Sequence, residues 1–105
     1  LAQNKLNDRD AAIQSFKRAI ELSPQFNRAY FELAKAYFEQ KRYLLARDTM
    51  GYYKALSQDT AESLWLLVRI EFNMGDSQAM TIYGNRLVTL FGDSEQAGSY
   101  QKLVQ

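Results

Sequence analysis

Four carboxylates of this chain could supply a general acid and a general base: Asp8, Asp10, Asp59 and Glu62. Each of them lies where a helix is expected to begin, and there a carboxylate caps free amides and interacts with the helix dipole. The chain has no histidine and no cysteine, which excludes imidazole bases, thiolate nucleophiles and the common zinc sites. It also has no glycine-rich phosphate loop. We therefore expect no enzymatic activity, no metal and no cofactor.

The composition narrows the class of partner. The formal net charge is +1 at pH 7, so no overall field attracts nucleic acid or an anionic membrane. No apolar run approaches the roughly 20 residues that a membrane-spanning helix needs. With 105 residues and 47% hydrophobic content, the chain is long enough to form one domain with its own core. A protein partner is the class that remains.

Aromatic and cationic residues alternate along two predicted helices that are about 34 residues apart. In each helix a ring, a cation and a ring follow one another at i, i+4 and i+7, the spacing at which side chains share one face. We expect this face to bind an amphipathic helix or an extended peptide, whose acidic flank or terminal carboxylate would meet the cations. The predicted partner-binding residues are Arg28, Phe31, Lys35, Phe38, Trp65, Arg69 and Phe72.

An alternative interpretation assigns the same rings to the hydrophobic core. The run "SLWLLVRIEF" is apolar nearly all round, which is typical of an enclosed helix, so Trp65 can be either core or binding surface. For Phe31 and Phe38 we expect exposure to solvent, because Tyr30 and Tyr37 already occupy the buried seam of their helix.

The elements that carry these residues follow from the positions of helix start and stop signals. Apolar residues at three and four spacing and a single proline favour helices nearly throughout. Asp59 with Glu62 predicts a capping box, and Gly75 and Gly92 predict helix ends. Asp76, and either Asp93 or Ser94, predict the caps of the last two helices. The expected helices span residues 8–22, 27–40, 43–56, 60–74, 76–91 and 94–103, and "LAQNKLNDRD" is expected to hold the end of a preceding helix and a turn.

Small and aromatic residues recur about every 34 residues: Ala12, Ala46 and Met80 correspond, and so do Phe16, Met50 and Gly84. This pattern resembles the tetratricopeptide repeat. The resemblance implies an all-α, right-handed superhelix of antiparallel helix pairs, an α-solenoid in which the first helix of each pair lines the concave face. We expect one domain over residues 1–105, with a partial repeat 1–26, repeats 27–60 and 61–94, and a capping helix 95–105, and we expect it to be part of a longer chain.

A second resemblance is more specific and lies in residues 61–94. The opening Ala-Glu-Ser-Leu-Trp-Leu, then Arg69, then Gly75 with Asp76, then Tyr83, are similar to the closing third of the type IV pilus biogenesis and stability lipoproteins, the PilF/PilW family. Gly92 departs from that family's usual proline. The resemblance implies a pilotin, a protein anchored by lipid to the periplasmic face of the bacterial outer membrane. A pilotin binds the secretin subunit and supports its localisation and assembly by protein contact alone.

Two other functions remain open. The chain could instead serve as a generic tetratricopeptide scaffold of another multiprotein complex. It could also be an accessory domain of a larger enzyme. A lipidated cysteine upstream of Leu1 would favour the pilotin, since this chain carries none. A catalytic domain downstream of Gln105 would favour the enzyme.

Overall fold

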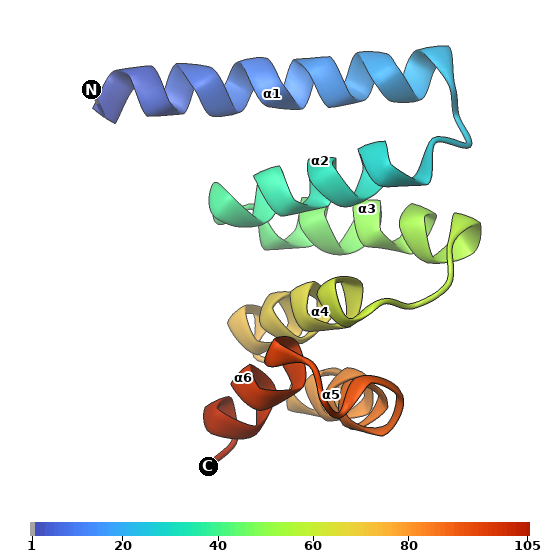
Figure 1. The fold of residues 1–105 in the computed structure, drawn as a ribbon. Coiled ribbons are helices and arrows are strands. Elements are labelled where there is room, and N and C mark those ends of the chain that lie inside the picture. Colours follow the sequence, from blue (N-terminus) through green and yellow to red (C-terminus); the bar gives the residue numbers. More distant parts are fainter. Residues whose placement is uncertain (1) are drawn as a thin grey trace. The chain divides into compact units, whose positions relative to one another are not determined.

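The structure is a computed structural model that describes the backbone of residues 2–105 and the side chains of residues 8–105. This part of the chain is all-α and contains no strand (Figure 1). The second to sixth helices begin and end within one residue of the predicted positions, so the predicted all-α repeat fold is confirmed. The helices are α1 (Ala2–Leu22), α2 (Asn27–Glu39), α3 (Tyr43–Leu56), α4 (Ala61–Met74), α5 (Ser77–Phe91) and α6 (Glu95–Leu103).

The first helix differs from its prediction. We expected a turn within "LNDRD" and a helix beginning near Asp8, whereas α1 runs without interruption from Ala2 to Leu22. Asn and Asp favour helix starts but do not break a helix that is already formed. Residues 2–22 contain no glycine and no proline, so every backbone hydrogen bond of the helix can continue through the expected turn. The predicted helix start at Asp8 is therefore wrong.

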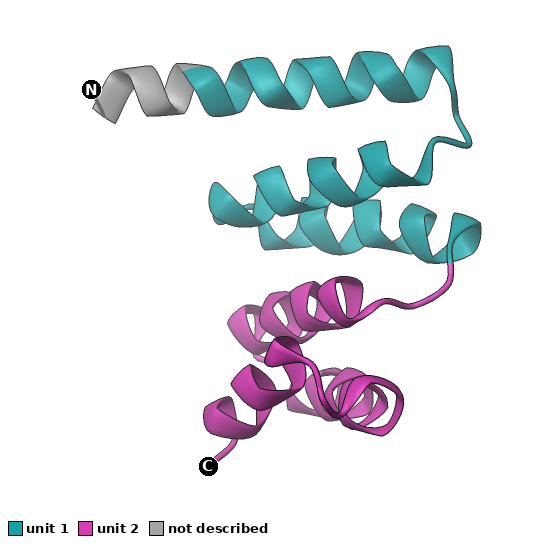
Figure 2. Ribbon diagram, viewed as in Figure 1, with its two compact units in different colours: residues 1–57 teal, residues 58–105 magenta. Residues whose placement is uncertain are grey.

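The helices form two compact units (Figure 2). In the first unit, residues 1–57, α2 packs against both α1 and α3. In the second unit, residues 58–105, α4 packs against α5, and α6 packs against both of them. Connections of two to four residues join successive helices within each unit, which favours antiparallel neighbours. The finer division into repeats stays a prediction.

Most of the buried seam that the repeat pattern predicts is buried, although Tyr30, which was expected there, is only half-buried. In the first unit Leu33, Ala34 and Tyr37 of α2 are buried, and Ala46 and Met50 of α3 are completely enclosed. In the second unit the buried residues of α4 include Leu64, Leu66, Leu67, Val68 and Ile70, and Leu87 of α5 joins them. A small residue such as Ala46 lets two helix axes approach closely.

The helices α2 and α4 end in the same motif, about 34 residues apart. In both, the residue after the last turn adopts the left-handed conformation, with φ of 62° at Lys41 and 78° at Gly75. This is the Schellman ending, in which the next amide donates back to a carbonyl of the last turn. The bonds run from Arg42 to Tyr37 and from Asp76 to Glu71, each 2.9 Å long. Glycine adopts this conformation freely, whereas a residue with a Cβ loses about 1–2 kcal/mol.

The cap of α4 lies one residue later than predicted. The predicted capping box of Asp59 and Glu62 is wrong, because Thr60 and Ser63 form it. The Thr60 hydroxyl accepts from the Ser63 amide at 3.0 Å, and the Ser63 hydroxyl accepts from the Thr60 amide at 2.8 Å. Asp59 instead pairs with Arg86 of α5, with 3.2 Å between nitrogen and oxygen.

The last two helices start at the predicted residues. The Asp76 carboxylate accepts a hydrogen bond from the Ala79 amide at 3.0 Å, which caps α5. Of the two candidates for α6, Ser94 is the cap, and its hydroxyl accepts from the Ala97 amide at 3.1 Å. Both side chains satisfy amides that a helix start would otherwise leave without an acceptor.

An aromatic ring that the third repeat lacks in its own sequence comes from α6. Gly84 of α5 stands where the two earlier repeats have Phe16 and Met50. A Cβ placed on Gly84 would overlap the ring of Tyr100, which is only 6% exposed. The Tyr100 ring therefore lies directly on the backbone of α5, and the missing side chain of Gly84 is the reason that it fits there.

Candidate protein-binding surface

The predicted binding residues of the first unit lie on α2, and Phe31 among them is not exposed. The Phe31 side chain is 4% exposed, and its ring lies 5.6 Å from the ring of Tyr53 on α3, centroid to centroid. The expectation that Phe31 faces solvent is wrong. A helical wheel locates the face of α2 that carries Phe31 but does not show that a Tyr53 ring covers it.

Arg28 is exposed and held in place by two contacts. Its guanidinium carbon lies 5.1 Å from the centre of the Phe31 ring. A guanidinium nitrogen lies 2.8 Å from a carboxylate oxygen of Glu32, one turn further along α2. The Arg28 side chain remains 60% exposed. The buried Phe31 ring thus supports a surface cation, a role that the sequence pattern did not indicate.

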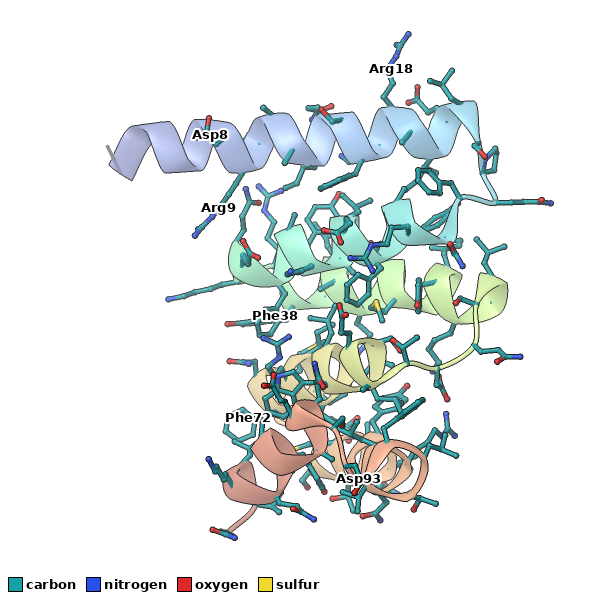
Figure 3. All side chains as sticks on the ribbon, in the orientation of Figure 1. Asp8, Arg9, Arg18, Phe38, Phe72 and Asp93 are labelled. Atoms are coloured by element: carbon teal, nitrogen blue, oxygen red, sulfur yellow. The ribbon has the colours of Figure 1, made fainter. Side chains whose placement is uncertain are left out.

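The other two residues of the α2 row remain accessible. Lys35 is exposed and Phe38 is half-buried. The Phe38 ring meets the ring of Tyr43 edge to face, with 5.5 Å between centroids, near the turn from α2 to α3 (Figure 3). Tyr43 thus covers part of the Phe38 ring.

The predicted binding residues of the second unit lie on α4. Trp65 is half-buried, so it lies neither wholly in the core nor wholly on the surface. The guanidinium carbon of Arg69 lies 5.2 Å from the centre of the Trp65 ring, which is a cation–π arrangement. Phe72, at the C-terminal end of α4, is 52% exposed (Figure 3). An exposed ring of this size on an otherwise buried helix is an apolar contact point.

Each unit therefore presents an arginine over an aromatic ring and a second ring further along the same helix. The order differs between the two helices, since Arg28 precedes its ring by three residues and Arg69 follows its ring by four. The prediction that the two rows line one common groove stays a prediction. The sequence analysis missed Glu32, Tyr43 and Tyr53, which hold the row on α2 in place. Tyrosines at the predicted start and end of α3 were the available signal.

The described residues supply neither a metal site nor a membrane span. Residues 8–105 contain no group of three or more carboxylate, imidazole or thiol side chains that could hold a metal ion. In the part of the chain that the structure describes, none of the helices combines the length and the apolar character that crossing a membrane requires.

Comparisons with known proteins agree with the fold. Residues 2–41 match the family model described as TPR repeat. The search of curated proteins gave no match. The solved structure of PilF from Pseudomonas aeruginosa is similar with a TM-score of 0.81 and 20% identity over 93% of this chain. The structure of PilW, described as a widely conserved type IV pilus biogenesis factor, is similar with a TM-score of 0.84 and 25% identity over 96% of this chain.

This chain spans less than half of the length of each of those two structures, 44% of PilF and 45% of PilW. The likeness nevertheless extends over both compact units, because it covers nearly all of the present chain. The repeat match and these structures together confirm the tetratricopeptide resemblance that the sequence showed. The chain thus has the helical-repeat fold of tetratricopeptide proteins, similar to the pilus biogenesis factor PilW and to PilF of Pseudomonas aeruginosa, and residues 2–41 match the repeat itself.

Proposed function

We propose that this chain belongs to a pilotin-like factor of type IV pilus biogenesis, which binds the secretin and supports its outer-membrane localisation and assembly. The single observation that carries the proposal is the fold likeness to PilW over 96% of the chain. The motif in residues 61–94 adds to it. The factor would act at the periplasmic face of the outer membrane, and its membrane contact would come from a lipid anchor outside this chain.

Each unit carries its own proposed contact surface. In the first unit it consists of Arg28, Lys35 and Phe38 of α2, and in the second unit of Trp65, Arg69 and Phe72 of α4. An amphipathic segment of the secretin would lay its apolar side on the rings and direct its acidic side to the cations. Phe31 takes no direct part and supports Arg28 from below. No step of this function requires catalysis.

Arg28 and Phe72 suit this role for separate physical reasons. Arg28 is already held over a ring and beside Glu32, so binding a carboxylate immobilises less of its side chain than binding by a free arginine would. About half of the Phe72 side chain is exposed, and covering it with a partner would contribute about 1 kcal/mol or more. Such a contact is weak alone and becomes specific in combination with others.

Isothermal titration calorimetry with the purified secretin of the same organism tests the proposal. Arg28→Ala and Phe72→Ala are expected to weaken binding about tenfold each. The matched controls are Arg18→Ala, which removes an arginine that projects away from α2 (Figure 3), and Phe26→Ala, which removes a ring that is 48% exposed.

Two outcomes would contradict the proposal. If the secretin does not bind the unmodified protein, the pilotin assignment fails and the generic scaffold remains. If the secretin binds but the control variants weaken it as much as Arg28→Ala and Phe72→Ala do, the surface assignment fails.

A further inference from the structure

A polar recess of about 440 Å³ lies in the first unit, where α2 turns into α3. Its lining combines three cations, two carboxylates and one amide. Arg9 reaches it from α1, and Figure 3 shows this side chain extending toward the C-terminal end of α2. The lining residues are Arg9, Asp10, Glu39, Gln40, Lys41 and Arg42.

Both carboxylates of the recess are already engaged. An oxygen of Glu39 lies 4.0 Å from the Nε of Arg9. The Gln40 side-chain amide donates a hydrogen bond of 2.9 Å to Asp10. Within residues 8–105 neither the Lys41 nor the Arg42 side chain has an ion pair or a hydrogen bond. Residues 1–7 contain no Asp or Glu that could pair with them. Lys41 and Arg42 therefore lie outside any ion pair of the described residues, and the lining as a whole has a net charge of +1.

Two further groups of the same turn lack partners. Arg42 is the N-cap residue of α3 and makes no side-chain cap, and the first turn of α3 contains no acidic residue. The amides that begin α3 thus add positive potential beside Lys41 and Arg42. The Oε1 atom of Gln40 is buried and accepts no hydrogen bond from the described residues. A buried acceptor of this kind is uncommon in folded proteins and is usually matched by a donor from water or a ligand.

Lys41 occupies its position against the local backbone preference. It is the only residue other than glycine with a positive φ in the described chain, and the corresponding position of the next repeat is Gly75. Glycine would form the same helix ending without the steric conflict of a Cβ. A residue held in a sparsely populated conformation suggests that its side chain has a use. Compared with glycine, Lys41 adds a positive charge to the recess.

We propose that this recess binds an acidic segment of a protein partner. Carboxylates of the segment meet Lys41 and Arg42 at the start of α3. An acidic segment offers several carboxylates in a row, so it can meet both cations at once, whereas a small anion meets them one at a time. The inference does not depend on the secretin assignment, because it uses none of the residues of the α2 and α4 rows.

A fluorescently labelled hexaglutamate peptide tests the inference by anisotropy at low ionic strength, where exposed charges are least screened. Lys41→Gly is expected to weaken binding about fivefold, the effect of losing one charge contact. The same change is expected to raise the Tm by about 4 °C, because it relieves the left-handed lysine. Opposite changes in affinity and in thermal stability separate loss of function from damage to the fold.

Two more variants complete the experiment. Arg42→Gln is expected to weaken the peptide about fivefold without the rise in Tm. Lys17→Gln, which removes one charge from the same unit outside the recess, is the control and is expected to leave the affinity unchanged.

Three results would overturn the inference. The first is peptide binding that responds equally to Lys17→Gln and to Lys41→Gly. The second is displacement of the peptide by inorganic phosphate or an oligonucleotide of equal charge at the same concentration, which would show a nonspecific anion site. The third is a fall in Tm for Lys41→Gly, which would show that the lysine stabilises the turn rather than straining it.

Discussion

Replacing Gly84 by alanine tests how α6 docks on α5. The Tyr100 ring occupies the place that a Cβ on Gly84 would take, so the alanine forces the ring and its helix to move. Overpacking of this kind typically costs about 1–3 kcal/mol, and we expect the upper end because several ring atoms lie in the way. The better helix propensity of alanine offsets about 1 kcal/mol of that cost. The net expectation is a loss of about 2 kcal/mol in the free energy of unfolding.

The same substitution at Gly98 provides a matched control. Gly98 lies within α6 of the same unit, and nothing stands within 4 Å of a Cβ placed on it. Gly98→Ala is therefore expected to stabilise the unit by about 1 kcal/mol through helix propensity alone. The two variants change the same atoms in the same kind of element, so the gap of about 3 kcal/mol between them isolates the contact with Tyr100.

Urea unfolding followed by tryptophan fluorescence measures this gap. The chain has one tryptophan, Trp65 of α4, so its emission reports on the second unit. In a Tyr100→Ala background the clash is absent, and Gly84→Ala should then stabilise the protein as Gly98→Ala does. The reasoning is refuted if Gly84→Ala stabilises the unmodified protein, or if removing Tyr100 leaves its effect unchanged.

Five further substitutions, in three tests, have expected outcomes from the same structure. Ala46→Leu should lower the free energy of unfolding by about 1–3 kcal/mol, because Ala46 is fully enclosed; an unchanged urea midpoint would contradict the close packing of α3. Thr60→Ala should lower the free energy of unfolding by about 1 kcal/mol, because α4 loses its cap. Asp59→Ala should lower it by at most about 1 kcal/mol, because only a partly exposed ion pair is lost. A larger fall in Tm for Asp59→Ala than for Thr60→Ala would indicate that Asp59 is the cap. Phe31→Ala should cost about 3–5 kcal/mol, whereas Phe72→Ala should change stability by less than about 1 kcal/mol; equal effects by circular dichroism would contradict their difference in burial.

Helix positions were predictable here because the signals that set them are local. A glycine in the left-handed region at Gly75 and the caps at Asp76 and Ser94 act through hydrogen bonds to residues three to five positions away. Such contacts depend on the neighbouring sequence and little on the rest of the fold. The shift of the α4 cap from Asp59 to Thr60 lies within the uncertainty that adjacent capping residues leave.

The repeat and its small crossing residues were also predictable from the sequence. Ala12 and Ala46 correspond in the repeat pattern; Ala46 is completely buried, whereas Ala12 is half-buried. Periodicity reports which residues share a face of a helix. It therefore identified the α2 face that carries Phe31 and the cations beside it.

The sequence by itself determined the helices, the repeat period and the residues that share each face. Only the tertiary structure decided what covers each face, because burial depends on side chains from other helices. Tyr53 of α3 removes Phe31 from solvent, and Phe31 in turn supports the exposed Arg28. Tyr100 of α6 fills the place that Gly84 leaves open. The contacts of Tyr53 with Phe31 and of Tyr100 with Gly84 join residues that lie too far apart in the chain for local preferences to couple them.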